Sequence, residues 1–305
     1  MASAELQALV QGLRAGGMDF SAAPAAVRTA FSAMTAAAPL PADVQVRECS
    51  LGGLPALETR TPGIDPDRVL LYLHGGAFVI GSARDYLTLS AALGRAAGCR
   101  AVSVDYRLAP EHPFPAAVDD ALLAWRSLLA EGVPAQRIVL AGDSAGGGLA
   151  LALLVAARDA GLPLPAGALL LSPWVDLACE SPSMRERATA DPALTREGLL
   201  AMAAHYLQGR PPSEPLASPV HADLEGLPPL LVQVGTAEVL LDDSLRLANR
   251  AAQADVPLTL AVWPQMVHVW HFFAFMLPEG GRALEEAGAF LRGRLAAGSQ
   301  PGAGR

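Results

Sequence analysis

A chain of 305 residues, 52% hydrophobic and 17% charged, is long and apolar enough to bury one large core, as α/β proteins of this size commonly do. Its net charge of -8 argues against the clustered positive surface that a nucleic-acid backbone requires. Cys49, Cys99 and Cys179 are scattered without Cys-x-x-Cys spacing. We therefore expect reduced thiols, as small core residues, and neither disulfides nor a zinc site.

The sequence carries no recognisable membrane signal. Its first residues include an early acidic residue, Glu5, and apolar residues at helical spacing, which differs from a secretory signal peptide. No window reaches the roughly 20 uncharged apolar residues that span a bilayer. The longest candidate, 146–157, ends at Arg158 and Asp159. We expect a cytoplasmic protein without a membrane span.

In chain order, two helical patterns come first, at 6–13 and 24–37. Two short β-like runs then flank Gly52-Gly53 and predict an antiparallel hairpin, at 44–50 and 54–59. Apolar runs typical of strands covered on both faces follow at 69–73, 101–104, 138–141, 168–171, 230–234 and 258–263. Helical patterns between and after them lie at 87–97, 116–130, 145–160, 244–254 and 282–295.

This alternation predicts a doubly wound α/β fold, with about eight mostly parallel strands and helices on both faces. We expect the main domain to comprise residues 41–180 and 216–297. The insertion at 181–215, with a helical pattern at 196–207, would pack with the N-terminal helices of 1–40 as a small cap, because inserts above such sheets usually touch the ligand crevice. The tail, 298–305, is rich in glycine and polar residues.

The segment Gly142-Asp143-Ser144-Ala145-Gly146 stands between a strand run and a helical run. A Gly-x-Ser-x-Gly sequence in this place predicts a nucleophile elbow, a tight turn that exposes the serine Oγ. The glycines are required because side chains there would collide with the neighbouring strand and helix. A serine hydroxyl is a poor nucleophile, so Ser144 needs a base, an acid behind the base, and donors for an oxyanion.

His268 is the predicted base. It lies on a loop after the strand at 258–263 and before a helical pattern at 270–276, which completes the chain order serine, acid, histidine. Its rival, His271, falls within that helical run, where an imidazole more often packs. The two histidines, three positions apart, lack a suitable third ligand, so no metal is expected.

The predicted acid is Glu238, the first carboxylate after the strand at 230–234 and 30 residues before His268. It would accept the imidazole Nδ1–H and fix the tautomer. Asp242 and Asp243 stand at the start of the next helix, where a carboxylate normally binds backbone N–H groups. Asp242 remains the alternative acid.

Oxyanion donors are expected from the residue after the serine and from His74-Gly75-Gly76-Ala77-Phe78, which follows an early strand. Consecutive glycines let the backbone fold back so that its N–H groups point at a substrate carbonyl oxygen. His74 is expected to orient this loop by hydrogen bonding.

Four motifs taken together resemble the hormone-sensitive lipase family of bacterial carboxylesterases, over about residues 40–295. They are the 74–77 loop, the segment 105–116, the 142–147 elbow and Met266-Val267-His268. The resemblance implies an α/β-hydrolase fold, a helical cap, hydrolysis of carboxylic esters and no cofactor. By this resemblance Ser144 is the nucleophile and His268 the base. It assigns the oxyanion hole to Gly75, Gly76, Ala77 and Ala145, with Gly75 shaping the turn.

Two positions depart from the family pattern, which commonly has a third glycine at Ala77 and an aspartate at Glu238. The alanine keeps its N–H, whereas the longer acid changes the reach toward the histidine. Asp105, Arg107 and Glu111, in the proline-rich segment, are expected to pair and hold the elbow from below. The substrate-binding candidates are Phe78, Trp174, Trp270 and Tyr206. The candidates for an acyl-side wall are Phe31, Met34, Met202 and Tyr206.

The sequence thus predicts a serine esterase that hydrolyses small or short-chain acyl esters through an acyl-enzyme intermediate. A lactone hydrolase is the enzymatic alternative, because a ring ester needs the same oxyanion hole. A non-catalytic small-molecule receptor of the same fold is the alternative from another class, against which His268 weighs. The expected partner is a small-molecule ester, and a homodimer is left open.

Overall fold

The computed structural model describes residues 3–297, so the predicted tail at 298–305 lies outside the described residues. Its centre is one eight-stranded sheet in the order β1-β2-β4-β3-β5-β6-β7-β8. The strands are β1 (Gln45–Leu51), β2 (Leu54–Arg60), β3 (Asp65–Leu73), β4 (Cys99–Val104), β5 (Ile138–Asp143), β6 (Ala168–Leu171), β7 (Leu230–Gly235) and β8 (Leu258–Trp263).

The predicted hairpin and parallel sheet are confirmed. β1 pairs antiparallel with β2, and β2 pairs antiparallel with β4. From β4 to β8 every neighbouring pair is parallel. β3 begins at Asp65, four residues earlier than predicted. Residues 65–68, Asp-Pro-Asp-Arg, are partly exposed and carry three charged side chains, so they lack the apolar signal of a buried strand.

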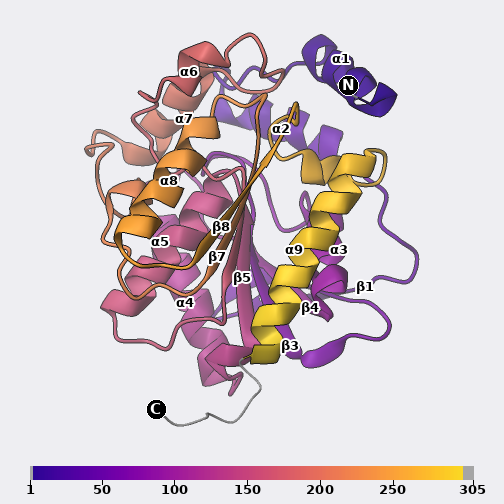
Figure 1. Cartoon of the computed structure of the whole chain (residues 1–305), viewed down its shortest axis with the longest axis vertical. Helices are drawn as coiled ribbons and strands as arrows, with labels where there is room; N and C mark the ends of the chain where they lie inside the picture. Colours follow the sequence, from indigo (N-terminus) through magenta and orange to yellow (C-terminus); the bar gives the residue numbers. More distant parts are fainter. Residues whose placement is uncertain (1–2, 298–305) are drawn as a thin grey trace.

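Helices cover both faces of the sheet (Figure 1). On one side lie α3 (Leu87–Ala97) and α9 (Pro278–Ala297); on the other lie α4 (Ala116–Ala130), α5 (Ala145–Asp159) and α8 (Leu241–Gln253). α9 starts at Pro278, a residue well suited to a first helical turn, before the predicted 282. The helical pattern predicted at 270–276 forms only the short 3₁₀ helix η3 (Trp270–Phe273). The other 3₁₀ turns are η1 (Ala135–Arg137) and η2 (Pro219–His221).

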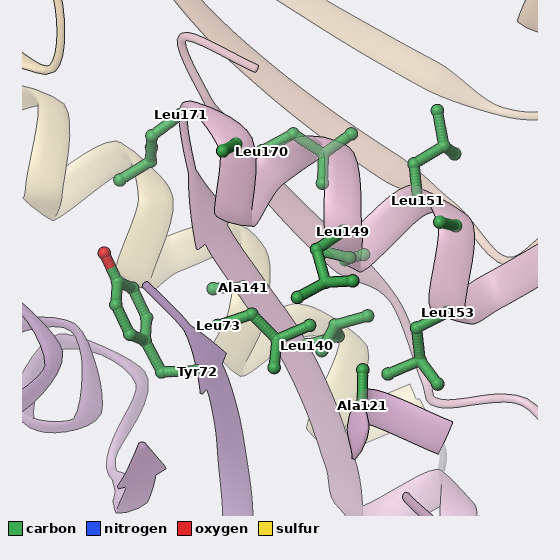
Figure 2. Close-up of a cluster of buried hydrophobic side chains, with 14 of the residues drawn as sticks. Tyr72, Leu73, Ala121, Leu140, Ala141, Leu149, Leu151, Leu153, Leu170 and Leu171 are labelled. Atoms are coloured by element: carbon green, nitrogen blue, oxygen red, sulfur yellow. The ribbon is translucent and has the colours of Figure 1, made fainter. Parts of the chain in front are cut away.

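α5 is the central helix, with 12 of its 15 residues buried. A helix that is apolar all round is typical of a core position. Figure 2 shows part of this core, where Leu73 and Leu140 of adjacent strands lie beside Leu149 of α5. Because α5 begins directly after Ser144, this packing also fixes the place of the serine.

Four further helices lie at one end of the molecule, at the top of Figure 1. They are α1 (Ala4–Ala15), α2 (Pro24–Thr35), α6 (Ser183–Glu186) and α7 (Arg196–Leu207). α1 buries Leu6 and Leu9 against Met266 and Trp270. Thr195 caps the start of α7, where its Oγ1 accepts a hydrogen bond from the Gly198 amide at 3.1 Å. The N-terminal and inserted helices thus lie at the same end of the sheet.

Arg28 anchors α2 to the loops beneath it. Its guanidinium donates to the carbonyl oxygens of Val79 and Ala109, both at 2.8 Å. It also forms a two-pronged ion pair with Glu111, at 2.8 and 2.7 Å, which lowers the pKa of that carboxyl to about 2. One side chain therefore joins α2 to two loops.

The charges of the proline-rich segment do not pair with one another as expected. The Asp105 carboxylate accepts from the Ala83 amide at 2.6 Å, and Arg107 pairs with Asp120 of α4 at 2.8 Å. Glu111 forms its ion pair with Arg28 of α2. Each charge ties this segment to a different element, because its turns direct the side chains apart.

Candidate active site

Ser144 occupies a strained turn between β5 and α5. Its φ of 53° and ψ of -123° lie in a region that non-glycine residues rarely adopt. The Ser144 amide donates to the Leu171 carbonyl at 2.8 Å, and its carbonyl accepts from the Trp174 amide at 2.9 Å. This is the geometry predicted from the Gly-x-Ser-x-Gly sequence.

The glycines on either side of Ser144 permit close backbone approach. A Cβ on Gly142 would overlap the Gly146 carbonyl at the start of α5. A Cβ on Gly146 would overlap the carbonyl oxygens of Leu73 and His74, at the end of β3. The elbow and the loop after β3 are consequently in main-chain contact.

Glu238 and His268 meet in the structure. Glu238 is fully buried on the loop after β7, and its Oε2 lies 2.8 Å from His268 Nδ1. The other oxygen, Oε1, accepts from the Gly235 amide at 2.6 Å and from Ser172 Oγ at 2.8 Å. Ser172 also accepts from the Val269 amide, next to the histidine, at 3.2 Å. Both ends of the carboxylate are therefore fixed.

The imidazole of His268 is electrostatically supported as a cation. Burial alone would lower its pKa, but the hydrogen bond and negative charge of Glu238 outweigh burial, so the pKa is raised above its ordinary value. His271 has the opposite environment. Burial, followed by the charge of His268, lowers the pKa of His271 to about 3, and its Nε2 lies 2.9 Å from Gln233 Oε1. His271 is thus a neutral core residue, as expected from its sequence context.

The two aspartates after Glu238 accept hydrogen bonds from backbone amides of other segments. Asp242 accepts from the Ser183 amide at 2.8 Å. Asp243 accepts from the amides of Val175 and Asp176, at 2.9 and 3.0 Å. Neither caps its own helix, because α8 begins without a side-chain cap. Asp242, the alternative acid, is therefore engaged away from His268.

The backbone amides of the loop 74–78 differ in whether they have a hydrogen-bond partner. The Gly75 amide donates to Asp143 Oδ1 at 2.9 Å, so Gly75 shapes the loop and its N–H is not available to an oxyanion. Gly76, Ala77 and Phe78 follow with positive φ values of 108°, 53° and 62°. Within residues 3–297, the amides of Gly76, Ala77 and Ala145 have no hydrogen-bond partner.

Asp143, inside the elbow motif, is a site residue that sequence analysis did not single out. Its Oδ1 accepts from Tyr72 Oη at 2.6 Å as well as from Gly75. Complete burial raises the pKa of this carboxyl to about 6, against the hydrogen bond from Tyr72. The side chain thus holds the serine turn and the 74–78 loop together. Its position beside the serine was the available signal, whereas nothing in the sequence marked Ser172.

His74 supports the same loop, as expected. Its Nδ1 lies 2.7 Å from the Gly75 carbonyl, and its ring stacks on Tyr106 with 4.3 Å between centroids. Tyr106 Oη in turn donates to the His74 carbonyl at 2.7 Å.

Ser144 and His268 open into one cavity of about 130 Å³. Asp143, Gly76 and Ala77 also line it, and the rest of its wall is apolar. Phe31 and Met34 of α2 line it as expected, whereas Met202 and Tyr206 do not. Further apolar wall residues are Leu13, Met18, Phe20, Ile80, Tyr86, Pro192, Ala193, Leu194, Leu199, Val269, Phe272 and Phe273.

The four aromatic substrate-binding candidates lie outside this cavity. Phe78 and Tyr206 stack on each other with centroids 4.0 Å apart, and Trp174 lies 6.2 Å from Phe78. Trp270 is fully buried beneath Leu6 of α1. Because Phe78 has a positive φ, its ring packs into the core on α7 instead of entering the cavity.

Comparisons with known proteins agree with this geometry. The sequence pattern of a family described as "alpha/beta hydrolase fold" matches residues 70–272. The chain is similar to an acetyl-hydrolase of Streptomyces hygroscopicus, with 54% identity over 76% of this chain and 77% of that protein. Among solved structures it is similar to "an esterase from the bacterial hormone-sensitive lipase (HSL) family", with a TM-score of 0.93, 46% identity, and coverage of 97% and 99%.

A second solved structure is that of EstE5 soaked with p-nitrophenyl butyrate. It has a TM-score of 0.91 and 43% identity, and the match covers 97% of this chain and 100% of that one. In the part of this chain that the structure describes, no helix is long and apolar enough to cross a membrane.

Proposed function

Because the chain belongs to the alpha/beta hydrolase fold family, among the esterases of the hormone-sensitive lipase type, we propose that it hydrolyses small carboxylic esters at Ser144. The activity class, carboxylic ester hydrolase, follows from this membership. The assignment of the reacting residues rests on one observation: His268, whose Nδ1 lies 2.8 Å from Oε2 of the buried Glu238, lines the same cavity as Ser144.

In the first half-reaction, Ser144 Oγ attacks the ester carbonyl and His268 Nε2 takes its proton. Glu238 accepts the Nδ1–H, which leaves Nε2 free to act as the base, and stabilises the imidazolium that forms. The imidazolium then gives its proton to the departing alcohol, and the acyl group stays on Ser144.

The developing oxyanion is stabilised by the amides of Gly76, Ala77 and Ala145. They are proposed for this role because they lack partners and border the serine. In the second half-reaction, His268 removes a proton from water, which attacks the acyl carbonyl; the imidazolium then returns that proton to Ser144 Oγ as the bond between the acyl carbon and Oγ breaks, which releases the acid and restores the free serine.

The substrate is a small, uncharged ester. This is supported by the mainly apolar cavity wall, to which the described part of the chain contributes no arginine or lysine that could pair with an anionic substrate. The acetyl-hydrolase relative and the EstE5 soak with p-nitrophenyl butyrate agree with short acyl groups. Lactone hydrolysis by the same groups, a cytoplasmic location and a homodimer stay predictions.

Burst kinetics test the assignment. With p-nitrophenyl butyrate, one equivalent of p-nitrophenol should appear before steady turnover if deacylation is the slower step, and mass spectrometry should place a butyryl group on Ser144. Ser144→Ala should abolish both signals. Ser90→Ala is the matched control, because Ser90 is another buried serine and its hydroxyl donates to the Leu87 carbonyl of its own helix. Hydrolysis that survives in Ser144→Ala would reject the proposed nucleophile.

A further inference from the structure

A second cavity lies directly behind the wall of the first. It has a volume of about 360 Å³ and is lined mainly by apolar side chains of α3, η3, α9 and the segment before β1. Leu89, Ala92 and Leu284 contribute to it. At its rim Arg95 pairs with Asp43 at 2.6 Å, and Phe275 is 46% exposed. Neither Ser144 nor His268 borders it.

Among residues 3–297, Phe272 is the one residue that lines both cavities. Its ring meets Tyr86 edge-on, with centroids 5.8 Å apart and planes at 80°. It also meets Phe273 at 5.6 Å and 71°. Edge-to-face contacts of this kind favour one ring orientation. The ring is therefore held as a partition between the two spaces.

We propose that Phe272 limits the length of the acyl chain by closing the catalytic cavity against this second apolar space. The inference rests on the proposed function. The chain concerned is that of the acyl group, because it stays on the enzyme through both half-reactions while the alcohol must leave after the first. A closed apolar end suits the group that stays.

The effect of opening the partition follows from hydrophobic transfer. Each methylene that moves from water into an apolar space should raise kcat/KM about fourfold. Butyrate and decanoate differ by six methylenes; if only two of them enter the opened space, Phe272→Ala should already raise the decanoate-to-butyrate ratio of kcat/KM by at least about tenfold. Ala92→Phe alone is the matched control, because Ala92 lines the second cavity and not the catalytic one, so with Phe272 in place it should leave the ratio unchanged.

The experiment measures kcat/KM for p-nitrophenyl esters from C4 to C12 on the full chain. Ala92 borders only the second cavity, so Phe272→Ala/Ala92→Phe should return the ratio toward the wild-type value. If Phe272→Ala fails to fold, Phe272→Leu carries the test with a smaller shift in the same direction.

Three results would overturn the proposal. They are an unchanged ratio in Phe272→Ala, a changed ratio in Ala92→Phe alone, or a rise confined to a series of alkyl acetates, which would assign Phe272 to the alcohol side. Absence of all ester hydrolysis in the wild-type chain would instead reject the proposed function.

Discussion

Replacing Glu238 by glutamine should lower kcat about 10⁴-fold while leaving the fold intact. Glu238 Oε1 faces two donors, the Gly235 amide at 2.6 Å and Ser172 Oγ at 2.8 Å. The Gly235 amide can only donate, and the Ser172 hydroxyl already accepts from the Val269 amide. A glutamine must therefore keep its oxygen there and turn its NH₂ toward His268.

That orientation forces the wrong tautomer on the base. With an NH₂ opposite Nδ1, the imidazole must accept at Nδ1 and carry its proton on Nε2, where it can no longer accept the serine proton. The cost of about 10⁴ in rate is that of the equivalent acid-to-amide change in the serine protease triad, and corresponds to about 5.5 kcal/mol of transition-state stabilisation.

The assay is kcat for p-nitrophenyl butyrate at pH 8, with circular dichroism to establish folding. Asp242→Asn is the matched control, because Asp242 bonds the Ser183 amide and lies away from His268. It should change kcat by less than about threefold and lower stability by about 1 kcal/mol. Activity of Glu238→Gln within tenfold of wild type, or a larger loss in Asp242→Asn, would refute the reasoning.

Three further outcomes follow from the same structure. On acidification, kcat/KM should begin to fall above about pH 6.5, because the pKa of His268 is raised and only the neutral imidazole is a base. In Glu238→Gln this fall should occur at lower pH. If it stays at the same pH, Glu238 does not raise the pKa of His268. In urea unfolding, Gly146→Ala should lower the free energy of unfolding by about 3 kcal/mol or more, because the added Cβ would overlap main-chain atoms. Gly293→Ala, in open space on α9, should instead raise it by about 0.5–1 kcal/mol. Burial raises the pKa of Asp243 to about 7, so this group stabilises the fold below about pH 4, and that contribution is lost as pH rises through 7. The free energy of unfolding of Asp243→Asn should therefore vary less between pH 4 and pH 7 than that of the wild type. An equal pH dependence in the two proteins would contradict this prediction.

The fold and the elbow could be predicted because their signals are local. Strands buried on both faces read as apolar runs, and the turn at Ser144 needs glycines at fixed positions. The first residues of β3, 65–68, were not predicted as strand because they are partly exposed and three of them are charged. The start of α9 escaped because Pro278 and its following glycines weaken the helical pattern.

The pocket could not be predicted in the same way, because its wall depends on contacts between distant segments. Trp270 follows the base closely in sequence, yet α1, more than 250 residues upstream, covers it. Phe78 adjoins the oxyanion loop, but its backbone turns the ring onto Tyr206 of α7. The proposal of Glu238 rather than Asp242 as the acid likewise draws on the position of the Ser183 amide, which no pattern near either acid reveals.

The anchor at Arg28 bears on how such enzymes can diversify. Two of its three acceptors are main-chain carbonyls, which any sequence supplies, and only Glu111 is a side chain. An N-terminal segment from another protein would therefore dock on this sheet if it kept one arginine in register. A chimera can exchange the outer wall of the cavity in this way while the proposed reacting groups stay on the loops that follow β5, β7 and β8.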